Sequence, residues 1–288
     1  MKTPLASRLM AASTNRYTLE PVTFPVQKPK SPFFTLFGLL LLIGVFFPSL
    51  SCAEELIKSF SSDLWIHSDS SLTVQERITV ISEGNQIRRG IYRDFPTDYK
   101  DTQGNQYRVG FEVEEVTRDG RVEPFHTEKR PNGVRVYIGD KDIFIPDGEH
   151  SYTITYKTSR QIGYFEGFDE LYWNVTGNGW TFTIEKASAR VHLPEGASVK
   201  NYIAYTGYEG DTGRAFGTRD YADGIEFYTT KPLRPQEGLT IAVSWPSGFV
   251  AKPTDAEELG YLLADNKILL IGIVGLLVLV AYYLFVWW

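Results

Sequence analysis

Three arginines and one aspartate lie close together in residues 88–96, which read RRGIYRDFP. Arg88, Arg89, Arg93 and Asp94 are the residue types that could form a bidentate clamp for an anionic group. The same spacing also fits an arginine–aspartate network that braces a loop, with the neighbouring aromatic residues in the core. We therefore treat the four charged residues as candidate ligand-binding residues and keep the bracing interpretation open.

A second candidate lies in residues 171–180, LYWNVTGNGW, where aromatic residues alternate with turn-forming Asn and Gly. If Tyr172, Trp173 and Trp180 were exposed beside Asn174, their rings could stack on sugars. The alternative is that both tryptophans anchor the core on either side of a β-turn. We expect one of these two arrangements and take the four residues as candidate ligand-binding residues.

Acidic residues offer the remaining chemistry, because paired carboxylates can hydrolyse glycosidic bonds. Asp169, Glu170 and Asp94 would be the acids of such an envelope hydrolase. The chain has one cysteine and four scattered histidines, and it contains no G-x-S-x-G sequence. We therefore assign no catalytic residue, no cofactor and no metal, and expect that the protein is not an enzyme.

The elements that must position these residues are predicted to be β-strands. Apolar residues alternate with polar ones in six runs, and turn sequences such as Asp119-Gly120 and Asn132-Gly133 separate several of them. The runs are 72–80, 107–113, 134–138, 152–156, 180–193 (with a change of phase after residue 186) and 239–245. Short strands with such turns predict a mainly β fold, an antiparallel β-sandwich over residues 54–250.

Two apolar segments flank this domain. Residues 33–47 are short and apolar, follow Lys28 and Lys30, and precede Ser51-Cys52-Ala53, which predicts a signal peptide over 1–53 with a long n-region. An uncut signal anchor and lipidation at Cys52 remain alternatives. Residues 268–288 form 21 consecutive apolar positions, long enough for a transmembrane helix. Between them, residues 251–267 predict a linker and a short helix that begins with the capping box Thr254–Glu257.

This layout predicts an integral protein of the bacterial inner or plasma membrane, with the β domain outside and the C-terminus in the cytoplasm. Residues 1–53 hold five of the 29 basic side chains and one of the 35 acidic ones, so the remainder has a net charge near −10. Such a domain lacks the basic surface that nucleic acid requires, and anionic lipid headgroups would repel it. We expect an envelope protein or glycan as partner.

The two candidate stretches also carry a family resemblance. GIYRDFP at 90–96 and the run from residue 138 to 194, above all 164–180, closely resemble the bacterial predicted membrane proteins called domain of unknown function 2207. The resemblance covers roughly residues 54–250 and implies an extracytoplasmic β-rich domain in a membrane protein. It implies no established activity. Typical members continue beyond the first membrane helix, whereas this sequence stops at Trp288.

Three hypotheses follow. The first is a membrane-anchored module for recognition or scaffolding, which binds its partner through residues 88–96 and 164–180. The second is the sensory ectodomain of a larger, multi-pass membrane protein. The third is the hydrolase with paired carboxylates. We prefer the first, which overlaps with the second.

Overall fold

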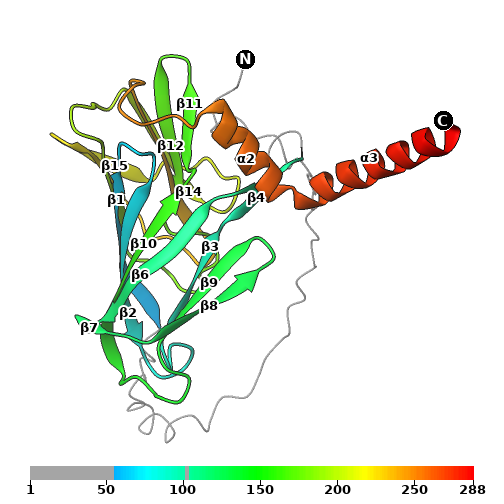
Figure 1. Ribbon diagram of the computed structural model, residues 1–288. Helices are drawn as coiled ribbons and strands as arrows, with labels where there is room; N and C mark the ends of the chain where they lie inside the picture. The colour runs from blue at the N-terminus through cyan, green and yellow to red at the C-terminus, as the bar shows by residue number, and fades with distance from the viewer. Residues whose placement is uncertain (1–54, 101–103) are drawn as a thin grey trace, which may run out of the picture.

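The structure is a computed structural model that describes residues 55–100 and 104–288, apart from the side chains of 268–270. The predicted signal peptide at 1–53, including Cys52, lies outside the described residues. The described chain folds into four β-sheets followed by two helices, as Figure 1 shows.

The largest sheet has eight strands, and the hydrophobic core covers one of its faces. The first strand in the described part of the chain, β1, lies in the middle of this sheet, paired with β2 on one side and with β13 on the other. In sheet order the strands are β15 (Phe216–Tyr221), β16 (Gly224–Thr229), β13 (Ala187–His192), β1 (Leu56–Ile66), β2 (Leu72–Ser82), β10 (Gly148–Ser159), β6 (Gly110–Arg118) and β7 (Arg121–Val122).

Three smaller sheets complete the domain. One has four strands, β11 (Ile162–Phe165), β12 (Phe168–Asn174), β17 (Gly238–Trp245) and β14 (Asn201–Gly207). Another has three, β3 (Ile91–Pro96), β9 (Gly133–Ile138) and β8 (Phe125–Arg130). The last is the hairpin of β4 (Asp98–Lys100) and β5 (Gln106–Arg108).

Alternation of side chains explains how these sheets share one core. In β2, every second residue from Leu72 to Ser82 is buried, because successive side chains of a strand point to opposite faces. The inward side chains of the large sheet, among them Phe60 and Phe227, join those of the four-stranded sheet, among them Trp245. The three-stranded sheet joins the same core through Phe95, whose ring lies 4.8 Å from that of Tyr156.

The mainly β prediction is confirmed, but two of its details are wrong. Strands β1 and β13 are parallel, so the large sheet is mixed rather than antiparallel. The expected strand over residues 180–184 does not form. Instead, Ile184 makes two isolated bridges, to Ile57 and to Leu233. The backbone around Ile184 thus forms hydrogen bonds with two different segments just before β13 begins.

Two helices follow the β domain. Helix α2 (Asp255–Asp265) begins with the predicted capping box, in which the side chains of Thr254 and Glu257 each accept a hydrogen bond from the other's backbone N–H. Helix α3 (Lys267–Trp287) extends away from the domain (Figure 1). Among the residues whose side chains are described, no helix is both long and apolar enough to cross a membrane. The transmembrane prediction for 268–288 is therefore not confirmed.

Candidate functional site

Strand β3 carries two of the four charged candidates on opposite faces. Along Ile91–Pro96 buried residues alternate with less buried ones, so Arg93 points into the core and Asp94 points away from it. Each of the two residues pairs with an opposite charge on its own face. Strand β3 therefore has an inner and an outer arginine–carboxylate pair.

The inner pair joins Arg93 to Glu76 of β2, with side-chain exposures of 6% and 0%. The guanidinium donates two parallel hydrogen bonds, from Nε to Oε2 at 2.9 Å and from Nη2 to Oε1 at 3.0 Å. The Tyr156 hydroxyl donates a third hydrogen bond to Glu76, at 3.0 Å. A fully buried carboxylate thus has one bidentate arginine and one hydroxyl as donors, which is the arrangement that a buried charge requires.

One further hydrogen bond of Arg93 holds the second candidate stretch, while its Nη1 donates to the carbonyl oxygen of Asp94 at 3.1 Å. Nη2 donates to the carbonyl oxygen of Val175 at 3.0 Å, and a Cβ placed on Gly177 would lie 2.6 Å from Nη1. Burial alone would lower the pKa of Arg93, but the charge of Glu76 and its hydrogen bonds raise it. Arg93 therefore stays charged and joins the two candidate stretches from inside the core, with its guanidinium closed to an external anion.

The aromatic residues of 171–180 lie mostly inside the domain. Trp180 is buried, its Nε1 donates to the Thr176 carbonyl at 2.8 Å, and its ring meets Phe60 edge-on at 6.3 Å. Trp173 is buried as well, and its Nε1 has no hydrogen-bond partner among the described residues. Both tryptophans thus occupy the positions expected of core anchors.

The two other candidates of this stretch are partly accessible. Asn174 organises the turn, because its Oδ1 accepts from the Gly177 N–H and its Nδ2 donates to Asn178, both at 3.0 Å. Burial raises the pKa of the half-buried Tyr172, and the nearby Tyr205 adds to this. The turn of this stretch is therefore held by its own side chains.

The outer pair belongs to an exposed row of side chains across the three-stranded sheet, which we call the outer ladder. Arg135 donates to Asp94 twice, at 2.6 and 2.7 Å, and the side chains of these two are 18% and 42% exposed. The Arg135 guanidinium lies 4.0 Å from the ring centroid of Tyr92, and His126 stacks on Tyr137 at 4.8 Å. The outer ladder consists of Tyr92, Asp94, His126, Arg135 and Tyr137.

The sequence analysis missed four members of the outer ladder: Tyr92, which the bracing interpretation placed in the core, and His126, Arg135 and Tyr137. A signal was present for two of them. The run 134–138 was predicted as a strand from its alternating apolar residues. In such a strand, the residues between the apolar ones face outward, which places Arg135 and Tyr137 on the surface. His126 lies on β8, for which the sequence shows no alternation. Glu76 was missed as well, because nothing in the β2 pattern marks a buried carboxylate.

The two other arginine candidates lie at one end of the domain. The guanidinium groups of Arg88 and Arg89 lie 5.2 and 4.2 Å from the ring centroid of the exposed Phe144. The loop just before them wraps around the Glu55 carboxylate, which accepts hydrogen bonds from the backbone N–H groups of residues 83, 85, 86 and 87. Arg88 and Arg89 are therefore exposed on a loop that a buried carboxylate holds in place.

The acids proposed for hydrolysis do not form a pair. Asp169 and Glu170 are consecutive in β12, so their side chains point to opposite faces of the sheet. Burial raises the pKa of Asp169, although Lys252, Ser247 and Gly248 act in the opposite direction. Burial also raises the pKa of Glu170. Asp94 lies in another sheet, paired with Arg135.

The described residues contain no group of three or more metal-ligating side chains.

Comparisons with known proteins place the chain in a family. Residues 56–245 match the model of the "Predicted membrane protein (DUF2207) N-terminal domain". The chain is also 30% identical over 262 residues to "Uncharacterized protein YciQ" of Escherichia coli (strain K12). That match covers 86% of this chain but 41% of YciQ, so the chain spans about two fifths of the length of this relative.

Solved structures resemble the fold only distantly. Leukotriene A4 hydrolase from Saccharomyces cerevisiae matches 66% of this chain and 29% of its own, at 11% identity and a TM-score of 0.41. An M1 zinc metallopeptidase from Deinococcus radiodurans matches 68% and 44%, at 14% identity and a TM-score of 0.38. Neither likeness supports an argument about function. The family match covers most of the chain, and the protein belongs to the DUF2207 family of predicted membrane proteins.

Proposed function

We propose that this protein is a membrane-anchored recognition module of the bacterial envelope, which binds a protein partner through the outer ladder. The observation that carries the proposal is the ladder itself. Its rings and charges lie together on the outer face of a sheet, where Tyr92 and Asp94 are about 40% exposed, while the opposite face supplies the buried side chains that the core needs.

The chemistry of the outer ladder favours a protein as partner. Tyr and Arg side chains are enriched at the energetically important positions of protein interfaces. Here Arg135 is held between Asp94 and the ring of Tyr92, so little side-chain freedom would be lost when a partner binds. Edge strand β8 contributes exposed Glu128 and Lys129, which oppose non-specific strand addition and leave the ladder face as the binding surface.

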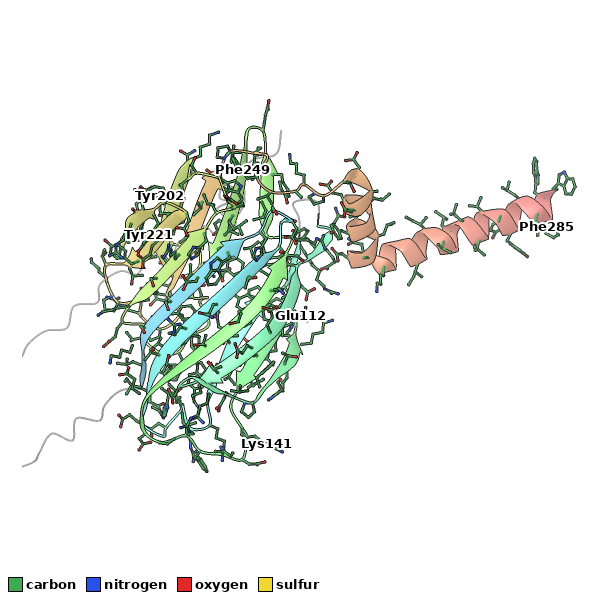
Figure 2. The ribbon with its side chains drawn as sticks, turned by 60° about the vertical axis from the view of Figure 1, so that its left-hand side comes forward. Glu112, Lys141, Tyr202, Tyr221, Phe249 and Phe285 are labelled. Carbon is green, nitrogen blue, oxygen red and sulfur yellow. The ribbon has the colours of Figure 1, made fainter. Side chains whose placement is uncertain are left out.

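Helix α3 is the membrane anchor in this proposal, with the β domain on the extracytoplasmic side. The description of the family as predicted membrane proteins and the apolar sequence 268–288 support this assignment. Its test is a C52S/K141C variant in intact cells, because Lys141 is exposed at the far end of the β domain (Figure 2). A membrane-impermeant maleimide should label it without lysis, and labelling only after lysis would contradict the orientation.

Recognition is tested by site-specific photo-crosslinking in cells. A photoreactive amino acid at Tyr92, 40% exposed on the ladder, should give a discrete adduct with another envelope protein. The matched control is the same amino acid at Tyr208, which is 48% exposed in the loop after β14. Equal adducts at both positions, or no adduct at Tyr92, would contradict the proposed function.

A specific contact favours a second candidate, the sensory ectodomain of a longer protein. Asp265, at the end of α2, forms an ion pair with Arg160 at 2.8 Å, with side-chain exposures of 9% and 16%. The next residue, Asn266, exchanges two hydrogen bonds with the backbone of Gln106, at 2.9 and 3.1 Å. The β domain is thereby fixed to the start of α3, as transmission of a conformational change to the membrane would require.

This coupling predicts a narrow range of distances between the domain and α3. Spin labels at Glu112 and Phe285, which Figure 2 shows on the β domain and near the end of α3, would report that distance. In a C52S background, D265A should broaden the distance distribution, whereas D255A, at the other end of α2, should leave it unchanged. Equal distributions in all three proteins would count against the sensory function.

A further inference from the structure

The two sheets of the core leave an open edge on one side of the domain, and a pocket of about 440 Å³ lies there. Strand β15 is an edge strand of the eight-stranded sheet, and β14 is an edge strand of the four-stranded sheet. Residues 197–202 form one wall of the pocket, and residues 220–222 with Gly224 form the other. Its size is within the range of pockets that hold small ligands.

A tyrosine stands at the mouth of this pocket. Tyr202 is 47% exposed, and its ring is held edge-on against the buried Phe227, with centroids 5.8 Å apart. Its hydroxyl lies 3.5 Å from the Thr218 hydroxyl of the opposite sheet. Figure 2 shows Tyr202 and Tyr221 at the same edge of the molecule. The ring of Tyr202 is thus both exposed and fixed, as a stacking platform must be.

Polar side chains of the pocket have unused hydrogen-bonding capacity. Asp220 alternates with Tyr221 on β15, and so shares the strand face of Thr218, which points toward Tyr202. Neither Asp220 nor the Asn201 side chain makes a hydrogen bond or ion pair with another described residue. A carboxylate and an amide beside an exposed ring can therefore accept and donate hydrogen bonds to a ligand.

The cations near the pocket are already engaged elsewhere. The Lys200 ammonium donates to the carbonyl oxygen of Gly167 at 3.2 Å and lies 5.3 Å from the ring centroid of Phe168. Arg190 lies over Tyr221 at 3.9 Å and is paired with Asp223 at 3.0 Å. The unpaired carboxylate of Asp220 opposes phosphate, sulfate and carboxylate ligands, whereas the Lys200 ammonium, which has no carboxylate partner among the described residues, is the lining cation that would attract them.

We propose that this pocket is a binding site for a neutral saccharide, whose C–H face stacks on Tyr202 and whose hydroxyl groups bond to Asp220 and Asn201. The site is separate from the outer ladder and does not depend on it. Such a site would let the domain contact an envelope glycan while another surface contacts a protein.

The test is titration calorimetry of the full chain in a detergent without a sugar headgroup. The probes are the neutral trisaccharides N,N′,N″-triacetylchitotriose, cellotriose and maltotriose, each titrated separately, with inorganic phosphate as the anionic comparison. At least one trisaccharide should bind, and phosphate should not. No binding by any of the three, or binding of phosphate alone, would overturn the proposal.

Variants connect that binding to the pocket. Y202A removes the stacking ring, and D220A removes a hydrogen-bond acceptor. Each variant should therefore weaken trisaccharide binding by about tenfold or more. Y202F keeps the ring and should stay within about threefold. Y208A removes a similarly exposed tyrosine outside the pocket and should not change the affinity. Far-ultraviolet circular dichroism confirms that each variant is folded, and unchanged affinity in folded Y202A and D220A would reject the site.

Discussion

Strand β3 carries two arginine–carboxylate pairs that have similar geometry and opposite surroundings. Both pairs are bidentate, with distances of 2.9 and 3.0 Å for Arg93–Glu76 and 2.6 and 2.7 Å for Arg135–Asp94. The first lies in the core and the second lies on the surface. Water screens the outer pair, whereas the inner pair has only protein atoms to compensate for the loss of hydration. The comparison therefore separates a pair that the fold depends on from one that is free to serve recognition.

The largest expected effect comes from breaking the inner pair. R93A leaves Glu76 buried without its main donor, and it removes the hydrogen bond to Val175. Loss of one member of a buried pair costs about 3–5 kcal/mol in the free energy of unfolding. Urea-induced unfolding of the detergent-solubilised chain, followed by tryptophan fluorescence, measures this cost. R135A, on the opposite face, should cost only about 0–1 kcal/mol.

A double variant shows whether R93A is destabilising because it leaves the Glu76 charge unpaired or because it removes other hydrogen bonds. If R93A is destabilising because Glu76 remains charged and buried, R93M/E76L should recover most of the loss, since apolar replacements of a buried pair are often neutral. A double variant as unstable as R93A would show that the hydrogen bonds to Val175 and from Tyr156 matter more than the ion pair does.

Another buried carboxylate, that of Glu55, shows whether an arginine is needed at all. Glu55 accepts its hydrogen bonds from four backbone N–H groups of residues 83–87 instead of a side-chain cation. E55Q should destabilise the protein by about 2 kcal/mol at pH 7, because hydrogen bonds to a charged group are lost. E83Q, in the same loop but with only its backbone in these contacts, is the control.

The pH dependence of that loss has a defined sign. Burial alone would raise the pKa of Glu55, but the backbone N–H groups lower it below its usual 4.5. Its contribution to stability is therefore full above the unfolded-state pKa and is lost as the pH falls toward the folded-state pKa. The difference between wild type and E55Q should shrink below about pH 4.5. A difference that grows in acid would contradict this account.

The contrast between the two faces of β3 also shows what the sequence could reveal. Alternation predicted the strands at 72–80, 134–138 and 239–245, because one face of each had to be apolar. It could not show that Arg93 would be buried, since its partner Glu76 lies 17 residues earlier, on a strand that no local signal pairs with β3. The interpretation of Trp173 and Trp180 as core anchors was open in the sequence, and the structure places both rings in the core.

The parallel pair β1–β13 was out of reach for a similar reason. Parallel neighbours have no turn between them, and more than 100 residues separate these two strands. The outer ladder likewise depends on register across three strands, which places Tyr92 beside Tyr137 and Tyr137 beside His126. Register is fixed by the buried face of each strand, so the order of the exposed residues follows only once the sheet is known.

A smaller effect tests the contact between Arg93 and the loop above it. Gly177 has φ +71° and would place a Cβ 2.6 Å from Arg93 Nη1, whereas Gly167 has φ +79° with open space around it. Both alanine variants carry the cost of a left-handed backbone, about 1–2 kcal/mol. G177A should be less stable than G167A by about a further 1 kcal/mol, because Arg93 must shift. Equal stabilities in urea unfolding would mean that Arg93 adapts without loss.

The smallest expected effect concerns the outer pair, and its salt dependence is the informative quantity. A double-mutant cycle of D94A and R135A should give a coupling energy of about 0.2–1 kcal/mol at 0.1 M salt. At 1 M salt it should fall, since the Debye length shortens from about 10 Å to about 3 Å. The equivalent cycle for Glu76 and Arg93 should barely respond, because solvent does not reach that pair. If the outer coupling exceeded about 2 kcal/mol and ignored salt, the ladder would be explained by stability alone. A weak and screened coupling instead leaves Asp94 and Arg135 available to a partner, which is what a recognition surface requires.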